Sequence, residues 1–290
     1  MASGLSALDH AIVLAYLAGV LGMSWAFARR QRTGTDYFLA GRAMGGATLG
    51  ASILANQASA VSLVGAPAFV ALKEGGGLRW LQYELALPLA MLLLVAFLLP
   101  ALRSVPGASV YAYAERRFGR GTRRALAGAF LLSRGLALGV ILYASSLVVS
   151  EATGLGVTGA LLAVGLLSVA YTSLGGVVAD IWSDVVQLAL LWLGTLASAA
   201  YLLSSSELVR AIPAERVQAL VPEFGPEAGS FTLAPMLLGG LFLYLSYYGC
   251  DQSQAQRLLT ARDEAAARRA LVLNGLLRFP LVLTYCGFGL

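Results

Sequence analysis

Charged side chains within long apolar stretches are the residues of this sequence best suited to chemistry. Glu84, Arg134 and Arg278 each stand inside a run of apolar residues, and Asp180 and Asp184 lie four positions apart at the start of another. A charge inside a membrane span costs roughly 2.5–3.5 kcal/mol on insertion scales, so such residues usually face a cavity or a partner. This pattern indicates binding of ions or polar solutes at membrane depth.

A second polar feature interrupts the apolar stretch from Asp36 to Ala71. Residues 56–62 place several hydrogen-bonding groups at the middle of a span, and Gly65 and Pro67 weaken the helix just beyond. Backbone exposed in this way persists in a bilayer only where protein or water meets it. Broken helices bind substrates and ions at the midplane of secondary transporters. The alternative is a Ser/Gly-rich helix that packs closely against its neighbours.

Each charge has a second interpretation. Arg134 lies nine residues past the basic start of its span, too deep for complete snorkelling, so it either pairs with an ion such as a substrate carboxylate or clamps free carbonyls. Glu84 faces a cavity or lies at the outer interface, and either Arg134 or Arg278 could pair with it. Asp180 and Asp184 are stabilised by a helix dipole, or one of them receives a cation that leaves to the cytoplasm.

These charges must be positioned by membrane-spanning helices. The 290-residue chain is 58% apolar and 12% charged, with a mean hydropathy of +0.76, which excludes a soluble globular domain. About 20 apolar residues cross the hydrocarbon layer of roughly 30 Å. We therefore predict an all-α polytopic membrane protein of about eight transmembrane helices, at 7–28, 44–71, 81–102, 125–150, 155–173, 184–205, 232–251 and 270–290.

The distribution of basic residues predicts the orientation. Alternate loops carry 14 lysines and arginines against 4 in the opposite set, so the first set is cytoplasmic and the N-terminus lies outside. This distribution, rather than a nucleic-acid partner, explains the net charge of +5. The predicted location is the cell inner membrane, with the lipid bilayer and a small-molecule solute as partners.

The sequence does not indicate an enzyme or a disulfide framework. It contains no transition-metal ligand cluster and no nucleophile with a nearby base, and its single histidine, His10, is peripheral. Cys250 and Cys286 both fall within or at the edge of spans, where they are expected to pack as small apolar residues.

Three blocks, DYFLAGR at 36–42, YTSLGGVVADIWSDVVQ at 171–187 and YYGCDQSQAQRLLTA at 247–261, together resemble the sodium:solute symporter family. The resemblance covers essentially the whole chain and implies a LeuT-type core of two inverted repeats preceded by one extra N-terminal helix. It assigns the first repeat to about 44–205 and the start of the second to about 232–290. Residues 1–290 would then form a single transmembrane transporter domain, incomplete at its C-terminal end.

The resemblance also implies site residues. The backbone carbonyls of Ala55 and Ala58 match the family's sodium site, whose other ligands lie on a later helix, and Asp184 matches an acid proposed to help sodium leave. Asp180 stands where the family usually has an apolar residue. The positions that match the family's substrate cavity are Gln57, Ser62, Glu84, Tyr247 and Arg278. We add Arg134 to these cavity candidates because it is an intramembrane charge.

The resulting hypothesis is a sodium-coupled symporter that imports a small organic solute by alternating access, with sodium as the co-transported ion. Two intramembrane arginines favour an anionic or zwitterionic solute. The alternative is a symporter-like sensor domain of a signalling protein, in which the same fold would be joined to a soluble module.

Overall fold

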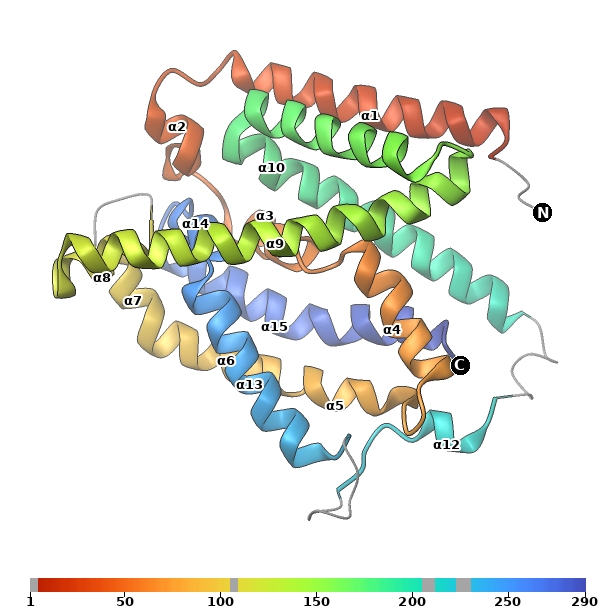
Figure 1. Cartoon of the computed structure of the whole chain (residues 1–290). Helices are drawn as coiled ribbons and strands as arrows, with labels where there is room; N and C mark the ends of the chain where they lie inside the picture. Colours follow the sequence, from red (N-terminus) through yellow and green to blue (C-terminus); the bar gives the residue numbers. More distant parts are fainter. Residues whose placement is uncertain (1–4, 105–108, 205–211, 223–230) are drawn as a thin grey trace.

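The computed structural model of the chain describes residues 5–104, 109–204, 212–222 and 231–290 (Figure 1). Within these residues the prediction of an all-helical membrane protein is confirmed, since every regular element is a helix. Six helical segments are long and apolar enough to cross a membrane: α1 (Ala7–Ala28), the run Gly77–Arg103, α9 (Arg120–Thr153), α10 (Val157–Leu203), α13 (Leu233–Cys250) and α15 (Glu264–Gly287).

Shorter helices connect or interrupt these spans. They are α2 (Gly34–Leu39), η1 (Ala40–Arg42), α3 (Gly46–Ala55), α4 (Ala60–Leu72), α8 (Tyr111–Phe118), α12 (Ala214–Val217) and α14 (Gln252–Leu259). The run Gly77–Arg103 consists of η2 (Gly77–Trp80), α5 (Leu81–Glu84), α6 (Ala86–Leu93), the π-helical η3 (Leu94–Leu98) and α7 (Leu99–Arg103).

The predicted span 44–71 is a broken helix, as its polar centre indicates. Helix α3 ends at Ala55, and α4 begins after Ser59, whose extended backbone and hydroxyl cap the new helix by accepting from the Ser62 N–H at 3.3 Å. A capping serine offsets one of the amide groups that a helix start leaves unpaired. The four residues between the two helices therefore expose backbone inside the bundle.

The predicted fifth and sixth spans form one 47-residue element, α10, with a break inside it. A straight helix of that length would measure about 70 Å, more than twice the hydrocarbon thickness. The break is at Gly176, where φ is 58° and ψ is −163°. Figure 1 shows the two arms of α10 turning back beside α2, so the predicted fifth and sixth spans correspond to the two arms of this one element.

The break in α10 is held by the segment that follows α1. Gln31 Nε2 donates to the Gly175 carbonyl at 2.6 Å, and the Tyr37 hydroxyl donates to the Ser173 carbonyl at 2.9 Å. These donors satisfy carbonyls that a helix break leaves without amide partners. The turn thereby fixes the start of the second arm, on which Asp180 and Asp184 lie one and two turns further on.

Replacing Gly176 with alanine should destabilise the protein strongly. A Cβ there would come within 2.8 Å of the Tyr37 carbonyl oxygen, and the backbone lies in a region that only glycine adopts readily. Such strain costs about 1–3 kcal/mol before the clash is counted. Gly194→Ala is the matched control in the same helix, because nothing lies within 4 Å of its added Cβ. Thermal unfolding in detergent should separate the two variants; equal midpoints would contradict the described turn.

The core joins the broken helix to the last span. On α3, a Cβ at Gly46 would meet the Ala266 carbonyl at 2.7 Å, and one at Gly50 would meet the Ala270 carbonyl at 3.2 Å, so α3 and α15 pack backbone to backbone. Small residues permit such close packing in membranes. One buried apolar cluster links α3, α6, α13 and α15, while α9 and the outer faces of α10 expose leucines to the surroundings.

Candidate functional site

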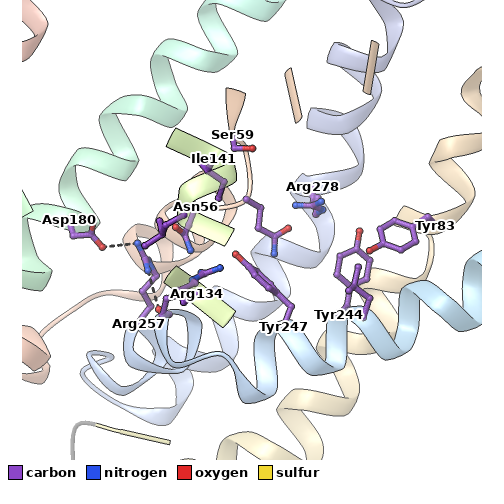
Figure 2. Close-up of a pocket in the computed structure, with 14 residues that line it drawn as sticks. Asn56, Ser59, Tyr83, Arg134, Ile141, Asp180, Tyr244, Tyr247, Arg257 and Arg278 are labelled. Carbon is purple, nitrogen blue, oxygen red and sulfur yellow. Dashed lines mark hydrogen bonds and ion pairs between the residues drawn. The ribbon is translucent and has the colours of Figure 1, made fainter. Parts of the chain in front are cut away.

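A cavity of about 590 Å³ lies where the broken helix meets six other elements, α5, α9, α10, α13, α14 and α15 (Figure 2). Its walls combine hydroxyl, amide and guanidinium groups with a few leucine and isoleucine side chains. The lining residues are Asn56, Gln57, Ser59, Tyr83, Arg134, Leu138, Ile141, Asp180, Leu243, Tyr244, Tyr247, Ser253, Arg257 and Arg278. A mixed lining with a few convergent polar groups is typical of a small-molecule site.

The unwound residues contribute carbonyls and amides to this region. The Ala58 N–H donates to the Ala55 carbonyl at 2.9 Å, which leaves that oxygen a second lone pair. The Ser62 N–H donates to the Ser59 hydroxyl at 3.3 Å instead of to the Ala58 carbonyl, and the Leu63 N–H donates to the Ser59 carbonyl at 3.0 Å. Both carbonyls proposed for sodium are thus at the break, where backbone oxygens can turn toward a cation.

Gln57 reaches across the bundle to α13. Its Nε2 donates to the Tyr248 hydroxyl, which also accepts from Asn274 Nδ2 at 2.7 Å. Within the described residues, Gln57 Oε1 and Asn56 Nδ2 are buried and have no hydrogen-bond partner. Buried polar atoms are nearly always paired in native proteins, so an acceptor and a donor without partners at a cavity wall are suited to a polar ligand or water.

Glu84 pairs with Arg278 at the end of the cavity nearest α5. Arg278 Nε lies 2.7 Å from Glu84 Oε2 and its Nη2 lies 3.2 Å from Oε1, a two-point contact. The Tyr244 hydroxyl donates to the same Oε2 at 2.7 Å. The Glu84 side chain is only 1% exposed and that of Arg278 is 14% exposed. Arg278 lines the cavity, while Glu84 lies behind it.

Arg134 is the least constrained arginine of the cavity. Its Nη2 donates to the Ser253 hydroxyl at 2.7 Å and lies 3.4 Å from Asp251 Oδ2, and its guanidinium carbon is 5.9 Å from the Tyr247 ring centre. No other nitrogen of Arg134 forms a hydrogen bond with a described residue. With 26% of its side chain exposed, Arg134 retains donors that face the cavity.

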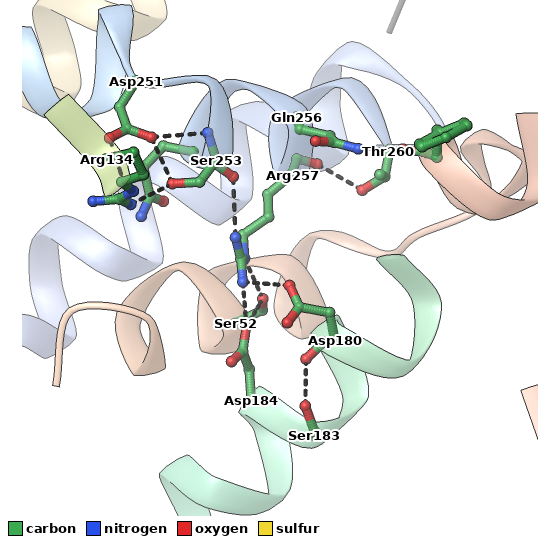
Figure 3. Close-up of polar contacts among 12 residues, drawn as sticks. Ser52, Arg134, Asp180, Ser183, Asp184, Asp251, Ser253, Gln256, Arg257 and Thr260 are labelled. Carbon is green, nitrogen blue, oxygen red and sulfur yellow. Dashed lines mark hydrogen bonds and ion pairs between the residues drawn. The ribbon is translucent and has the colours of Figure 1, made fainter. Parts of the chain in front are cut away.

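Arg257 holds a buried network between α3, α10 and α14 (Figure 3). Its Nη2 lies 2.7 Å from Asp180 Oδ2 and 2.8 Å from Asp184 Oδ2, and its Nε donates to the Ser52 hydroxyl at 2.9 Å. Ser52 in turn donates to Asp184 at 2.6 Å. Burial disfavours charged Arg257, but Asp184 and Asp180 raise its pKa above the ordinary value.

The network joins one arginine to two carboxylates, and the other two arginines have one carboxylate each. All three arginines of the cavity are therefore paired, and the wall carries no uncompensated positive charge. A solute anion must compete with Asp251 for Arg134, the weakest of these pairs by distance and burial. The arrangement can therefore bind an anion by exchanging the Asp251 carboxylate for the anion at Arg134.

The residues predicted from the sequence divide into two groups. Gln57, Tyr247, Arg134 and Arg278 line the cavity directly. Asp184 lies in the Arg257 network. Ser62 and Glu84 are not on the lining; the Ser62 hydroxyl donates to the Gln57 carbonyl at 3.3 Å. Their functional roles stay predictions.

Sequence reasoning missed Arg257, Ser52 and Ser253. Arg257 was present in the block at 247–261 but fell in a predicted loop, where a basic residue is ordinary. Its burial at 5% exposure follows from α14 packing against α3 and α10. A serine in the first half of a broken helix, such as Ser52, is a signal that could have pointed to this network.

The fold and the cavity define a polytopic helical membrane protein with a discontinuous helix beside a polar cavity. The model of the sodium:solute symporter family matches residues 37–288, and the chain belongs to that family. It is 30% identical to the human sodium/iodide cotransporter over 87% of this chain and 39% of that protein. It is 26% identical to human sodium-coupled monocarboxylate transporter 1 over 94% of this chain and 46% of that protein.

A solved structure agrees with the fold. A Na⁺-coupled sialic acid symporter, in a substrate-bound outward-open state, superimposes with a TM-score of 0.87 at 23% identity, over 97% of this chain and 59% of that chain. The predicted LeuT-type fold is thereby confirmed. The chain spans less than half the length of the two transporters above.

Proposed function

We propose that this chain forms the substrate cavity and half of the sodium site of a sodium-coupled symporter for a small anionic or zwitterionic organic solute. The single observation that carries the solute class is Arg134, a cavity arginine with uncommitted donors beside the Tyr247 ring. The named relatives support it, since one carries iodide and another monocarboxylates.

In this proposal sodium binds the carbonyls of Ala55 and Ala58 and stabilises the outward-open state. The solute then occupies the cavity, with its negative group on Arg134 and its polar remainder on Gln57, while Tyr247 closes the inner side. Sodium drives uptake because its binding free energy differs between the two states. Sodium and solute then leave to the inside past Asp184. Ser62, Glu84 and Arg278 shape the cavity. The proposed location is the cell inner membrane, with the N-terminus outside.

The test is sodium-gradient-driven uptake into proteoliposomes that contain the protein carrying this chain. The labelled solutes are L-lactate, iodide, alanine and glucose, with choline replacing sodium as the control. We expect sodium-dependent uptake of an anion or of alanine. Preference for glucose, or uptake that is equal in choline, would contradict the proposal.

Replacing Arg134 with glutamine should raise the KM for the anion about tenfold or more, because a hydrogen bond to a charged group contributes about 1.5–3 kcal/mol. Arg134→Lys keeps the positive charge but lacks the planar guanidinium group, so its KM should lie between those of the original protein and Arg134→Gln. Arg268→Gln is the matched control, because Arg268 is exposed and its one ion pair among the described residues is with Glu264 at 3.2 Å. An unchanged KM for the anion and unchanged selectivity in Arg134→Gln would show that Arg134 does not bind the solute.

A further inference from the structure

One residue connects the cavity arginine to the buried arginine network. The Ser253 hydroxyl accepts from Arg134 Nη2 at 2.7 Å, and the Ser253 carbonyl accepts from Arg257 Nη1 at 3.0 Å. Figure 3 shows Ser253 between the two guanidinium groups. No other described residue forms hydrogen bonds with both arginines.

The position of Ser253 is fixed by the break between α13 and α14. Asp251 caps α14 by accepting from the Ser253 N–H at 2.8 Å and from its hydroxyl at 2.5 Å. The same Asp251 forms the ion pair with Arg134 at 3.4 Å. Loss of the Arg134 contacts therefore takes a charged donor from the N-cap of α14, Asp251, and from Ser253 in its first turn.

The consequence reaches Arg257 because all three of its guanidinium nitrogens are engaged. Nη1 binds Ser253, Nε binds Ser52 and Nη2 binds the two aspartates. A shift of Ser253 alters one of these bonds and so reorients a group that joins α3, α10 and α14. In the predicted orientation these helix ends lie toward the cytoplasmic side.

We propose that Ser253 is a positioning residue that couples occupancy of the cavity to release of the Arg257 network. An anion that takes Arg134 from Asp251 and Ser253 loosens the start of α14, and Arg257 then releases Ser52 and the aspartates. The coupling step rests on the proposed function, because it requires an anion at Arg134. The contact relay itself involves only residues of this chain.

The test needs no solute. Ser183, which is 1% exposed and lies beside Asp180, is replaced with cysteine in a background where Cys250→Ala and Cys286→Ala remove the other thiols. The rate of N-ethylmaleimide alkylation at position 183, in inside-out vesicles, then reports how often the network opens.

We expect Ser253→Ala to raise the alkylation rate about tenfold, as for loss of one hydrogen bond to a charged group. Arg134→Gln should raise the alkylation rate by a similar factor. The double variant of Ser253→Ala and Arg134→Gln should raise it no further, because both substitutions break the same chain of contacts. Ser253→Thr keeps the hydroxyl and should retain the original rate. Ser133→Ala is the control, because within the described residues the Ser133 hydroxyl donates only to the Phe130 carbonyl of its own helix.

Additive effects of Ser253→Ala and Arg134→Gln, or an unchanged rate in Ser253→Ala, would overturn the proposal. If non-additivity is observed but none of lactate, iodide or alanine is taken up, the relay stands and the proposed transport function fails. If uptake occurs, Ser253→Ala should lower the maximal rate about tenfold with KM nearly unchanged. A change confined to KM would instead place Ser253 in the substrate site and overturn the coupling role.

Discussion

Arg257→Gln is expected to lower the free energy of unfolding by about 3–5 kcal/mol, because removal of one partner of a buried ion pair leaves uncompensated charge. Asp180 and Asp184 both depend on Arg257 Nη2, at 2.7 and 2.8 Å. The Arg257 side chain is 6% exposed and that of Asp184 is 11% exposed, so water cannot replace the lost interaction fully. Thermal unfolding in detergent would measure the loss.

Two further variants separate charge from geometry. Arg257→Lys keeps one positive charge but cannot bind Ser52, Ser253 and both aspartates at once, so its loss should be intermediate. Adding Asp184→Asn to Arg257→Gln removes one of the stranded charges and should recover part of the stability. If Arg257→Gln were as stable as the original protein, the described network would not hold these helices together.

The helices themselves could be predicted because hydropathy is a local property. The spans 7–28 and 232–251 agree with α1 and α13 to within a residue. The predicted interruption at 56–62 contains the break between α3 and α4, which is shorter, at 56–59. The last span begins at Glu264 rather than near 270, because Asp263 caps a helix whose first turns are charged. Charge lowers hydropathy without preventing a helix, so the boundary was set too late.

The pairing of charges could not be predicted because it depends on helix packing. Glu84 and Arg278 were each recognised as cavity candidates, but they are 194 residues apart and a pair between Glu84 and Arg134 was equally consistent with the sequence. Arg257 lies 205 residues from Ser52 and 73 from Asp184. Only the close approach of α3, α10 and α14 brings them together.

Replacing Glu84 with alanine is expected to cost about 3–5 kcal/mol, since Arg278 would keep a buried charge with no carboxylate. The two-point contact at 2.7 and 3.2 Å and the added bond from Tyr244 give the Glu84 carboxylate three hydrogen bonds. Tyr244→Phe removes one hydrogen bond to a charged acceptor and should cost about 1.5–3 kcal/mol. Thermal unfolding of the three proteins in detergent would rank them.

The double variant Glu84→Gln with Arg278→Gln decides whether this pair is structural or binds solute. With both charges removed, no uncompensated charge remains and most of the stability should return. Because Glu84 already pairs with Arg278, anion recognition should depend on Arg134. The double variant should therefore keep its KM for the transported anion within about threefold of the original, a smaller change than the loss of one hydrogen bond to a charged group would cause. A loss of anion uptake in a stable double variant would show instead that Arg278 leaves Glu84 to bind the solute.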